Sequence, residues 1–114
     1  MIKLDVPLLF LYTIYMKKVE NRFTKYGMQF KQIKRVGNVA IFEQSHPNWR
    51  SSRYEVVKIG HHNGYYLGKA WIEPAETYPG ASLWGLQGWT FTTLEEAMSK
   101  YKVLCTKANK KQLV

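Results

Sequence analysis

The sequence has little cysteine and no long apolar run. Cys105 is the single cysteine among 114 residues, so no disulfide can form within the chain, and a reducing, cytoplasmic setting is expected. The apolar run from Val6 to Tyr15 is interrupted by Pro7 and is too short to cross a bilayer as a helix. A secretory signal peptide has a basic stretch, an apolar core and a small-residue cleavage site in this order. The segment does not show this order, which argues against a signal peptide. We therefore expect no membrane partner.

Acidic residues are also scarce. The chain has 8 Asp+Glu against 17 Lys+Arg, a formal charge of +9 and a pI near 9.7. A positive field of this kind raises the local concentration of nucleic acid or of an acidic protein. Charge argues for association but not for specificity, so a soluble protein that happens to be basic is the alternative.

Hydrophobic residues make up 46% of the chain, which is ordinary for a globular protein. We expect one domain over residues 16–106, an apolar N-terminal extension over 1–15 and a basic tail over 107–114. The extension either packs on the domain or a partner, or precedes a working start at Met16. The polar segment MKKVENRFTKYG that begins at Met16 favours the second interpretation.

Apolar alternation and β-branched or aromatic runs predict a sheet. Gly37-Asn38 supplies a two-residue turn between the first two strands, and a change of phase at Ile33 suggests a bulge. Pro79-Gly80 suits the central pair of a type II turn. The expected strands cover residues 28–36, 39–44, 53–59, 65–73 and, less regularly because of Gly85 and Gly88, 83–91.

An amphipathic helix follows the last strand. Thr92 or Thr93 can cap it, with Glu95 or Glu96 three positions later. One apolar stripe contains Leu94, Ala97, Met98, Tyr101, Leu104 and Cys105. The predicted fold is α+β: a single antiparallel sheet of four to five strands with one C-terminal amphipathic helix packed on one face.

The other face of this sheet is a candidate binding surface. Several single-strand nucleic-acid binders stack bases on aromatic side chains while Lys and Arg follow the phosphates, and the ββββα order is similar in outline to whirly and purine-rich-element-binding domains. Trp49 stands in a polar loop among guanidinium groups and is expected to face solvent, whereas Trp71, Trp84 and Trp89 are expected in the core or at its edge. The predicted nucleic-acid-binding residues are Arg22, Lys25, Lys31, Lys34, Arg35, Trp49, Arg50 and Arg53.

Catalytic patterns are weak, and we expect a non-enzymatic protein with no cofactor, no metal and no catalytic residue. His61 and His62 before Asn63 superficially resemble an HNH nuclease motif, but adjacent strand residues point to opposite faces. Glu43 and Glu55 could face each other across neighbouring strands, yet the spacing does not enforce this. Spaced Cys/His pairs, a phosphate-binding glycine loop and a nucleophile elbow are absent from the sequence.

Four motifs, NRFTKYG, YEVVKI, EPAETYPG and WGLQGWTF followed by LEEA, resemble a pattern in small uncharacterised proteins of tailed bacteriophages and prophages. The resemblance covers residues 16–104. It implies a phage-encoded accessory protein that acts in the host bacterial cytoplasm, and it implies no activity or catalytic residue.

The leading hypothesis is a phage accessory protein that binds single-stranded or structured nucleic acid through a basic, aromatic-containing surface. The alternative is a protein-interaction module that binds and modulates an acidic host bacterial protein, or that homo-oligomerises. A virion or assembly component is a third interpretation. The sequence leaves the target, its chemical class and the oligomeric state open.

Overall fold

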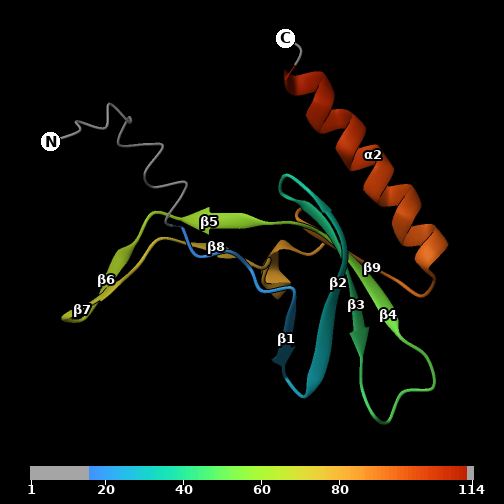
Figure 1. Ribbon diagram of the computed structural model, residues 1–114, viewed down its shortest axis with the longest axis horizontal. Coiled ribbons are helices and arrows are strands. Elements are labelled where there is room, and N and C mark those ends of the chain that lie inside the picture. Colours follow the sequence, from blue (N-terminus) through green and yellow to red (C-terminus); the bar gives the residue numbers. More distant parts are fainter. Residues whose placement is uncertain (1–15, 113–114) are drawn as a thin grey trace, which may run out of the picture. The chain divides into compact units, whose positions relative to one another are not determined.

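The computed structural model describes residues 16–112 (Figure 1). The predicted extension over 1–15 and the last two residues of the predicted tail lie outside the described residues. The chain divides into two compact units: one contains Glu20–Gly60 and the chain from Tyr78 onward, and the other contains His61–Thr77 with residues 16–19.

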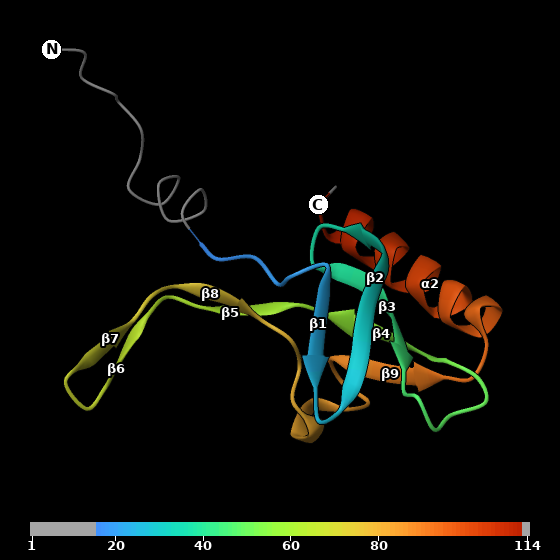
Figure 2. The same cartoon turned by 60° about the horizontal axis from the view of Figure 1, so that its bottom comes forward.

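The larger unit is an antiparallel sheet with a helix on one face, which confirms the predicted α+β fold (Figures 1 and 2). The strands neighbour one another in the order β1-β2-β3-β4-β9. Their bounds are Arg22–Lys25 for β1, Met28–Val36 for β2, Val39–Ser45 for β3, Arg53–Lys58 for β4 and Gly88–Phe91 for β9, and the helix α2 spans Leu94–Gln112.

The predicted hairpin of residues 28–44 is confirmed. Val36 pairs with Val39 around the turn, where Gly37 has a φ of 60°, and the register shifts between Gln32 and Lys34, the site of the predicted bulge. The additional strand β1 pairs with β2. Its sequence, RFTK, has one apolar residue and therefore no apolar alternation that would predict a strand.

The smaller unit corrects the prediction of one strand over 65–73. This segment is a two-stranded ribbon of β6 (Tyr65–Leu67) and β7 (Ala70–Ile72), because the chain reverses at Gly68, whose φ of 64° favours glycine. A second ribbon joins β5 (Gly60–His62) and β8 (Ala75–Thr77). Both ribbons lie outside the main sheet.

The segment before β9 also differs from its prediction. Gly80 is extended, with a φ of −78°, so Pro79-Gly80 does not form a type II turn, which requires a positive φ at this glycine. A 3-10 helix, η1, follows over Ala81–Leu83. A Cβ atom added at Gly88 would lie 2.5 Å from the Trp84 ring, so this glycine allows the close approach of a side chain.

The core between sheet and helix follows the predicted stripe. Ala97, Tyr101 and Leu104 pack on Ile41 and Val56, with Trp89 and Phe91 partly buried at its edge. Thr93 caps the helix: its Oγ1 accepts the Glu96 N–H at 3.2 Å, and its hydroxyl donates to Glu96 Oε1 at 2.9 Å. The helix continues to Gln112, so residues 107–112 of the predicted tail are helical.

The face of the sheet opposite α2 carries a cluster of aromatic rings that is partly covered. Phe23, Phe30 and Phe42 lie side by side on it, with the Phe23 and Phe30 rings stacked at 4.6 Å. The Tyr78 ring crosses all three, with ring centroids between 5.3 and 5.7 Å apart. The chain from Tyr78 to Trp84 thus covers part of the second face. Among residues 16–112 no helix combines the length and the apolar character that a membrane crossing needs.

We predict that Phe42→Ala lowers the free energy of unfolding by about 3–5 kcal/mol, because Phe42 is fully buried and the substitution leaves a cavity under Tyr78. Urea denaturation measures the change. The control Ile33→Ala, at an exposed bulge position, should cost about 0.5 kcal/mol. Equal losses of unfolding free energy in the two variants would contradict the packing of Phe42 under Tyr78 as a second core on this face.

Candidate nucleic-acid interface

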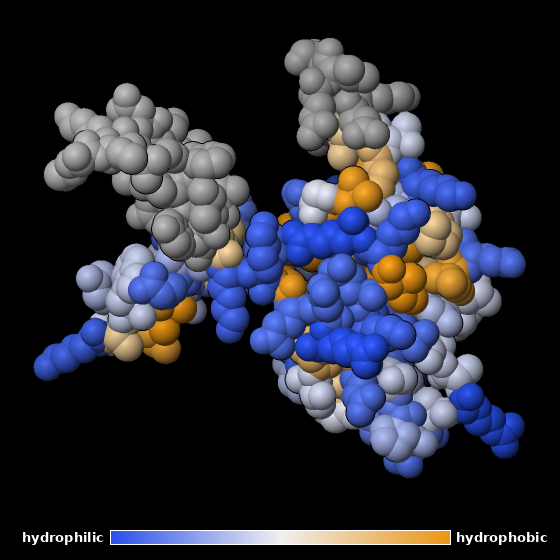
Figure 3. Space-filling view, viewed as in Figure 1, coloured by the Kyte–Doolittle hydropathy of each residue, from blue (hydrophilic) through white to orange (hydrophobic). Residues whose placement is uncertain are grey.

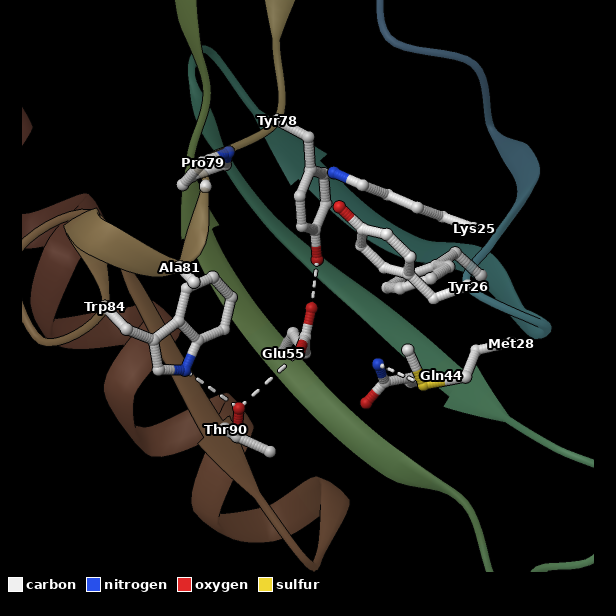
Figure 4. Close-up of a pocket in the computed structure, with 12 residues that line it drawn as sticks. Lys25, Tyr26, Met28, Gln44, Glu55, Tyr78, Pro79, Ala81, Trp84 and Thr90 are labelled. Carbon is white, nitrogen blue, oxygen red and sulfur yellow. Dashed lines mark hydrogen bonds between the residues drawn. The ribbon is translucent and has the colours of Figure 1, made fainter.

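A pocket of about 470 Å³ opens on the face opposite α2, beside Tyr78 (Figure 4). This volume is within the usual range for small-molecule sites. The turn between β1 and β2, the strands β2, β3, β4 and β9, and the segment before β9 all contribute. The lining residues are Lys25, Tyr26, Met28, Phe30, Gln44, Glu55, Tyr78, Pro79, Gly80, Ala81, Trp84 and Thr90.

Strand register places a carboxylate in this pocket. Glu55 pairs with Phe42 on β3 and with Thr90 on β9, so all three side chains are on the face opposite α2. The sequence YEVVK buries both faces of β4: Val56 packs under the helix, while Glu55 is buried on the pocket side. A glutamate rarely occupies such a position without hydrogen-bond partners.

Hydroxyl groups supply those partners. The Tyr78 hydroxyl donates to Glu55 Oε1 at 2.7 Å, and the Thr90 hydroxyl lies 3.5 Å from Oε2. Trp84 Nε1–H in turn donates to Thr90 Oγ1 at 2.9 Å. Figure 4 shows these side chains converging on the carboxylate from β9 and from the segment before it.

Burial raises the pKa of Glu55, and the hydrogen bonds from Tyr78 and Thr90 and the charges of Lys25 and Arg53 oppose this shift. Burial also raises the pKa of Tyr78, which the adjacent negative charge of Glu55 raises further. Among the residues that the structure describes, no Lys or Arg nitrogen forms an ion pair with Glu55. The pocket therefore contains a carboxylate that is hydrogen-bonded to hydroxyl groups and on which Lys25 and Arg53 act without forming an ion pair.

An aromatic side chain and a cation stand at the rim. Tyr26 is 85% exposed, and the Lys25 ammonium lies 5.3 Å from its ring centroid. Tyr26 has a φ of 54° in the turn that joins β1 to β2, a conformation that few residues other than Gly, Asn and Asp adopt. Tyr26 thus exposes a large aromatic ring to solvent, although its own backbone conformation is unfavourable for this residue type.

The loop between β3 and β4 carries a second aromatic–cation pair. The Arg53 guanidinium lies 4.3 Å from the Trp49 ring centroid, and the His46 ring packs on the indole at 5.6 Å. Trp49 is therefore half-buried between neighbours and does not project freely. Arg53 pairs with Gln44, which places it on the same face as the pocket.

The structure places six of the eight predicted nucleic-acid-binding residues on the two faces of the sheet and the other two on the loop between β3 and β4. Lys25, Arg35 and Arg53 are on the pocket face by register, and Trp49 and Arg50 lie on the adjacent loop. Arg22, Lys31 and Lys34 are on the helix side, where Arg22 and Lys31 line a separate hollow of about 330 Å³ that also contains Glu43. The Lys34 ammonium lies 5.8 Å from the Tyr101 ring.

Hydrophilic side chains gather over β1 and β2 in Figure 3, with smaller apolar patches between them. Arg35 is held by its own turn, because its Nε–H donates to the Gly37 carbonyl at 2.7 Å. Lys25 lines the aromatic-walled pocket, and Arg53 lies on the same face and acts electrostatically on Glu55. These two cations define the candidate interface together with Tyr26, Trp49 and Trp84.

Glu55, Tyr78 and Thr90 were not predicted as site residues. The suggestion that Glu43 faces Glu55 is wrong, because Glu43 pairs with Tyr54 and so lies on the opposite face. The only sequence signal was an acidic residue inside the β-branched run YEVVKI. This signal could not reveal the site, because Tyr78, the hydrogen-bond partner of Glu55, is 23 residues away in the sequence and contacts it only in the folded protein.

The motif of His61, His62 and Asn63 does not form a catalytic site with other residues that the structure describes. His62 Nδ1 accepts the Gly64 N–H at 3.1 Å and its ring contacts Tyr65 at 5.0 Å, which are local contacts of a turn. Between residues 16 and 112 no group of three His, Cys, Asp or Glu side chains could hold a metal ion.

No family model matches the chain, and neither a curated protein nor a solved structure matches it. The fold and the pocket thus define a small basic α+β protein, and its membership of a phage family stays a prediction.

We predict that the free energy of unfolding of the wild type, measured relative to Glu55→Gln, falls as the pH rises from 4.5, the ordinary glutamate pKa, to neutrality. A raised pKa in the folded state means that folding favours the protonated carboxyl, and this stability is lost once the buried group ionises. Urea denaturation of both proteins across this range isolates Glu55, since the other titrating groups are shared. A difference that grows with pH would contradict the prediction.

Proposed function

We propose that the chain is a non-enzymatic phage accessory protein that binds single-stranded or structured nucleic acid on the face of the sheet opposite α2. The observation that carries this proposal is the aromatic-walled pocket lined by Lys25, with Arg53 stacked on Trp49 on the same face of the sheet. The resemblance of the EPAETYPG and WGLQGWTF segments to phage proteins supports the phage origin and, with the single cysteine, action in the host cytoplasm.

The chemistry of the pocket face suits an unpaired strand. Exposed aromatic rings such as Tyr26 offer surfaces on which bases stack, and Lys25 at the rim and Arg53 on the same face can contact phosphates. Bases in a duplex are stacked on one another and present only their edges, so they could not enter a pocket of this kind. The helix-side cations are less suitable, because Arg22 and Lys31 share a hollow with Glu43, and the Tyr101 ring near Lys34 is buried.

We predict that the protein binds a labelled single-stranded oligonucleotide of about 15 nucleotides, with affinity that falls steeply between about 50 and 200 mM salt. The double variant Lys25→Ala/Arg53→Ala should weaken binding and lower the log–log salt slope by about 0.7 for each phosphate that the variant no longer neutralises. Fluorescence anisotropy at several salt concentrations measures both quantities.

The matched control is Arg22→Ala/Lys31→Ala, which removes the same charge from the helix side of the sheet. It should change the slope less than the first double variant. Equal effects of the two pairs would indicate attraction to the overall charge without a defined interface, and absence of binding at low salt would exclude the function.

A second candidate function, a protein-interaction module, is favoured by the ribbon of β6 and β7 in the smaller unit. Tyr65 and Leu67 are two positions apart on β6 and so lie on the same side of the ribbon, where they are 47% and 67% exposed. Adjacent exposed apolar side chains of this kind are frequent at interaction sites. A second copy of the chain or an acidic host protein could cover them.

If this ribbon mediates self-association, sedimentation velocity should show a mass that rises with protein concentration, and Leu67→Ser should shift the equilibrium towards the monomer. The control Leu86→Ser changes an equally exposed leucine of the larger unit and should have no effect. A monomer at all concentrations would contradict self-association and leave the nucleic-acid proposal unaffected.

A further inference from the structure

The pocket combines three features that together select a ligand. Its interior contains the Glu55 carboxylate, its walls include the Tyr78 and Trp84 rings, and its rim carries the Lys25 ammonium. The carboxylate requires hydrogen-bond donors on the ligand, the aromatic walls favour a flat ring, and the ammonium favours a negatively charged group.

The carboxylate has acceptor capacity that the protein does not use. An ionised carboxylate offers about four lone-pair positions. Each oxygen of Glu55 has one hydroxyl near it, from Tyr78 at 2.7 Å and from Thr90 at 3.5 Å. Both oxygens can therefore accept a further N–H from a ligand, and two such bonds would compensate the carboxylate for its burial.

The rim argues against a simple cationic ligand. Lys25 lies on the rim of the pocket, and the chain carries a formal charge of +9, so an alkylammonium ion would be repelled on approach. A ligand that is neutral where it meets Glu55 and anionic where it meets Lys25 satisfies both ends. A nucleotide has this polarity, with N–H donors on the base and a negative phosphate.

The identity of the base follows from the donor pattern. Guanine presents a ring N–H and an exocyclic amino group side by side on its Watson–Crick edge, which match the two oxygens of one carboxylate. Adenine and cytosine place a ring acceptor beside the amino group, and thymine flanks its ring N–H with two carbonyls. These acceptors would face the negative charge of Glu55 unfavourably.

We infer that the pocket holds one unpaired guanine, whose Watson–Crick edge donates to both oxygens of Glu55 while its ring lies against the aromatic walls. This inference rests on the proposed nucleic-acid binding and specifies which base the same site selects. Tyr26, held exposed at the rim with a φ of 54°, is the ring positioned to stack on the base or on its neighbour.

The test compares two labelled probes, an oligothymidine of about seven nucleotides and the same strand with one central guanine. The wild type should bind the guanine probe about tenfold more tightly, the usual scale for one bidentate contact. A third probe with hypoxanthine in place of guanine lacks the exocyclic amino group and should lose most of this preference. This comparison needs no variant, so it does not depend on whether a substituted protein folds.

Two variants then assign the preference to the pocket. Glu55→Gln replaces one acceptor oxygen with an amide donor and should abolish the guanine preference while the salt-dependent binding of oligothymidine persists. Tyr26→Asn removes the rim ring, and asparagine adopts positive φ readily, so this variant should remain folded and bind both probes more weakly.

The outcomes separate the two proposals. If the wild type binds both probes equally and in a salt-dependent manner, the guanine pocket is excluded and the nucleic-acid function stands. If neither probe binds, both are excluded. A guanine preference that persists undiminished in Glu55→Gln would also overturn the assignment, because the carboxylate would not be the group that reads the base.

Discussion

The structure depends on the burial of β3 and β4 on both faces. Val39 to Phe42 and Glu55 to Val57 are all buried, and successive strand residues point to opposite sides, so two apolar surfaces must be covered. The amphipathic helix α2 covers one of them. The other is covered by Tyr78 and the segment that follows it, and this second cover is incomplete. The pocket lies on this second face, between the sheet and the edge of the covering segment.

The incomplete cover explains the unusual position of Glu55. A carboxylate at the centre of a closed core would be very costly to ionise, whereas here two hydroxyl donors and the open side of the pocket reduce that cost. Tyr78 has two roles in this arrangement: its ring completes the aromatic layer over Phe23, Phe30 and Phe42, and its hydroxyl donates to the carboxylate. Packing and site chemistry thus depend on the same side chain.

Positive charge is present on both sides of the sheet, so charge by itself does not distinguish an interface. Cation–aromatic pairs also occur on both sides, since Lys34 lies near Tyr101 and Lys100 lies over Trp89 on the helix side. What distinguishes the pocket face is the exposed Tyr26 ring, which Lys25 accompanies at the pocket, and on the same face Arg53 lies over Trp49. A guanidinium stacked on an indole keeps its edge donors available for a phosphate. The helix side offers cations beside Glu43 and a buried tyrosine.

Much of the fold was predictable because it is encoded by local patterns. The stripe from Leu94 to Cys105 and the Thr93 cap specify the helix, and Gly37-Asn38 specifies the central hairpin, since each depends on residues a few positions apart. The errors arose where the local pattern was ambiguous. Residues 65–73 have strand character throughout, and only the positive φ at Gly68 makes them a ribbon.

The candidate site was predictable only in its residue types. Periodicity and composition were enough to specify the α+β fold class, the helix and the excess of positive charge, because each of these is written in neighbouring residues or in their totals. Which cations share a face depended on the folded sheet, since a single register shift between Gln32 and Lys34 changes the side to which the following residues point. The fold alone also brought Tyr78 to Glu55, because a contact between residues 23 positions apart has no local pattern that could predict it.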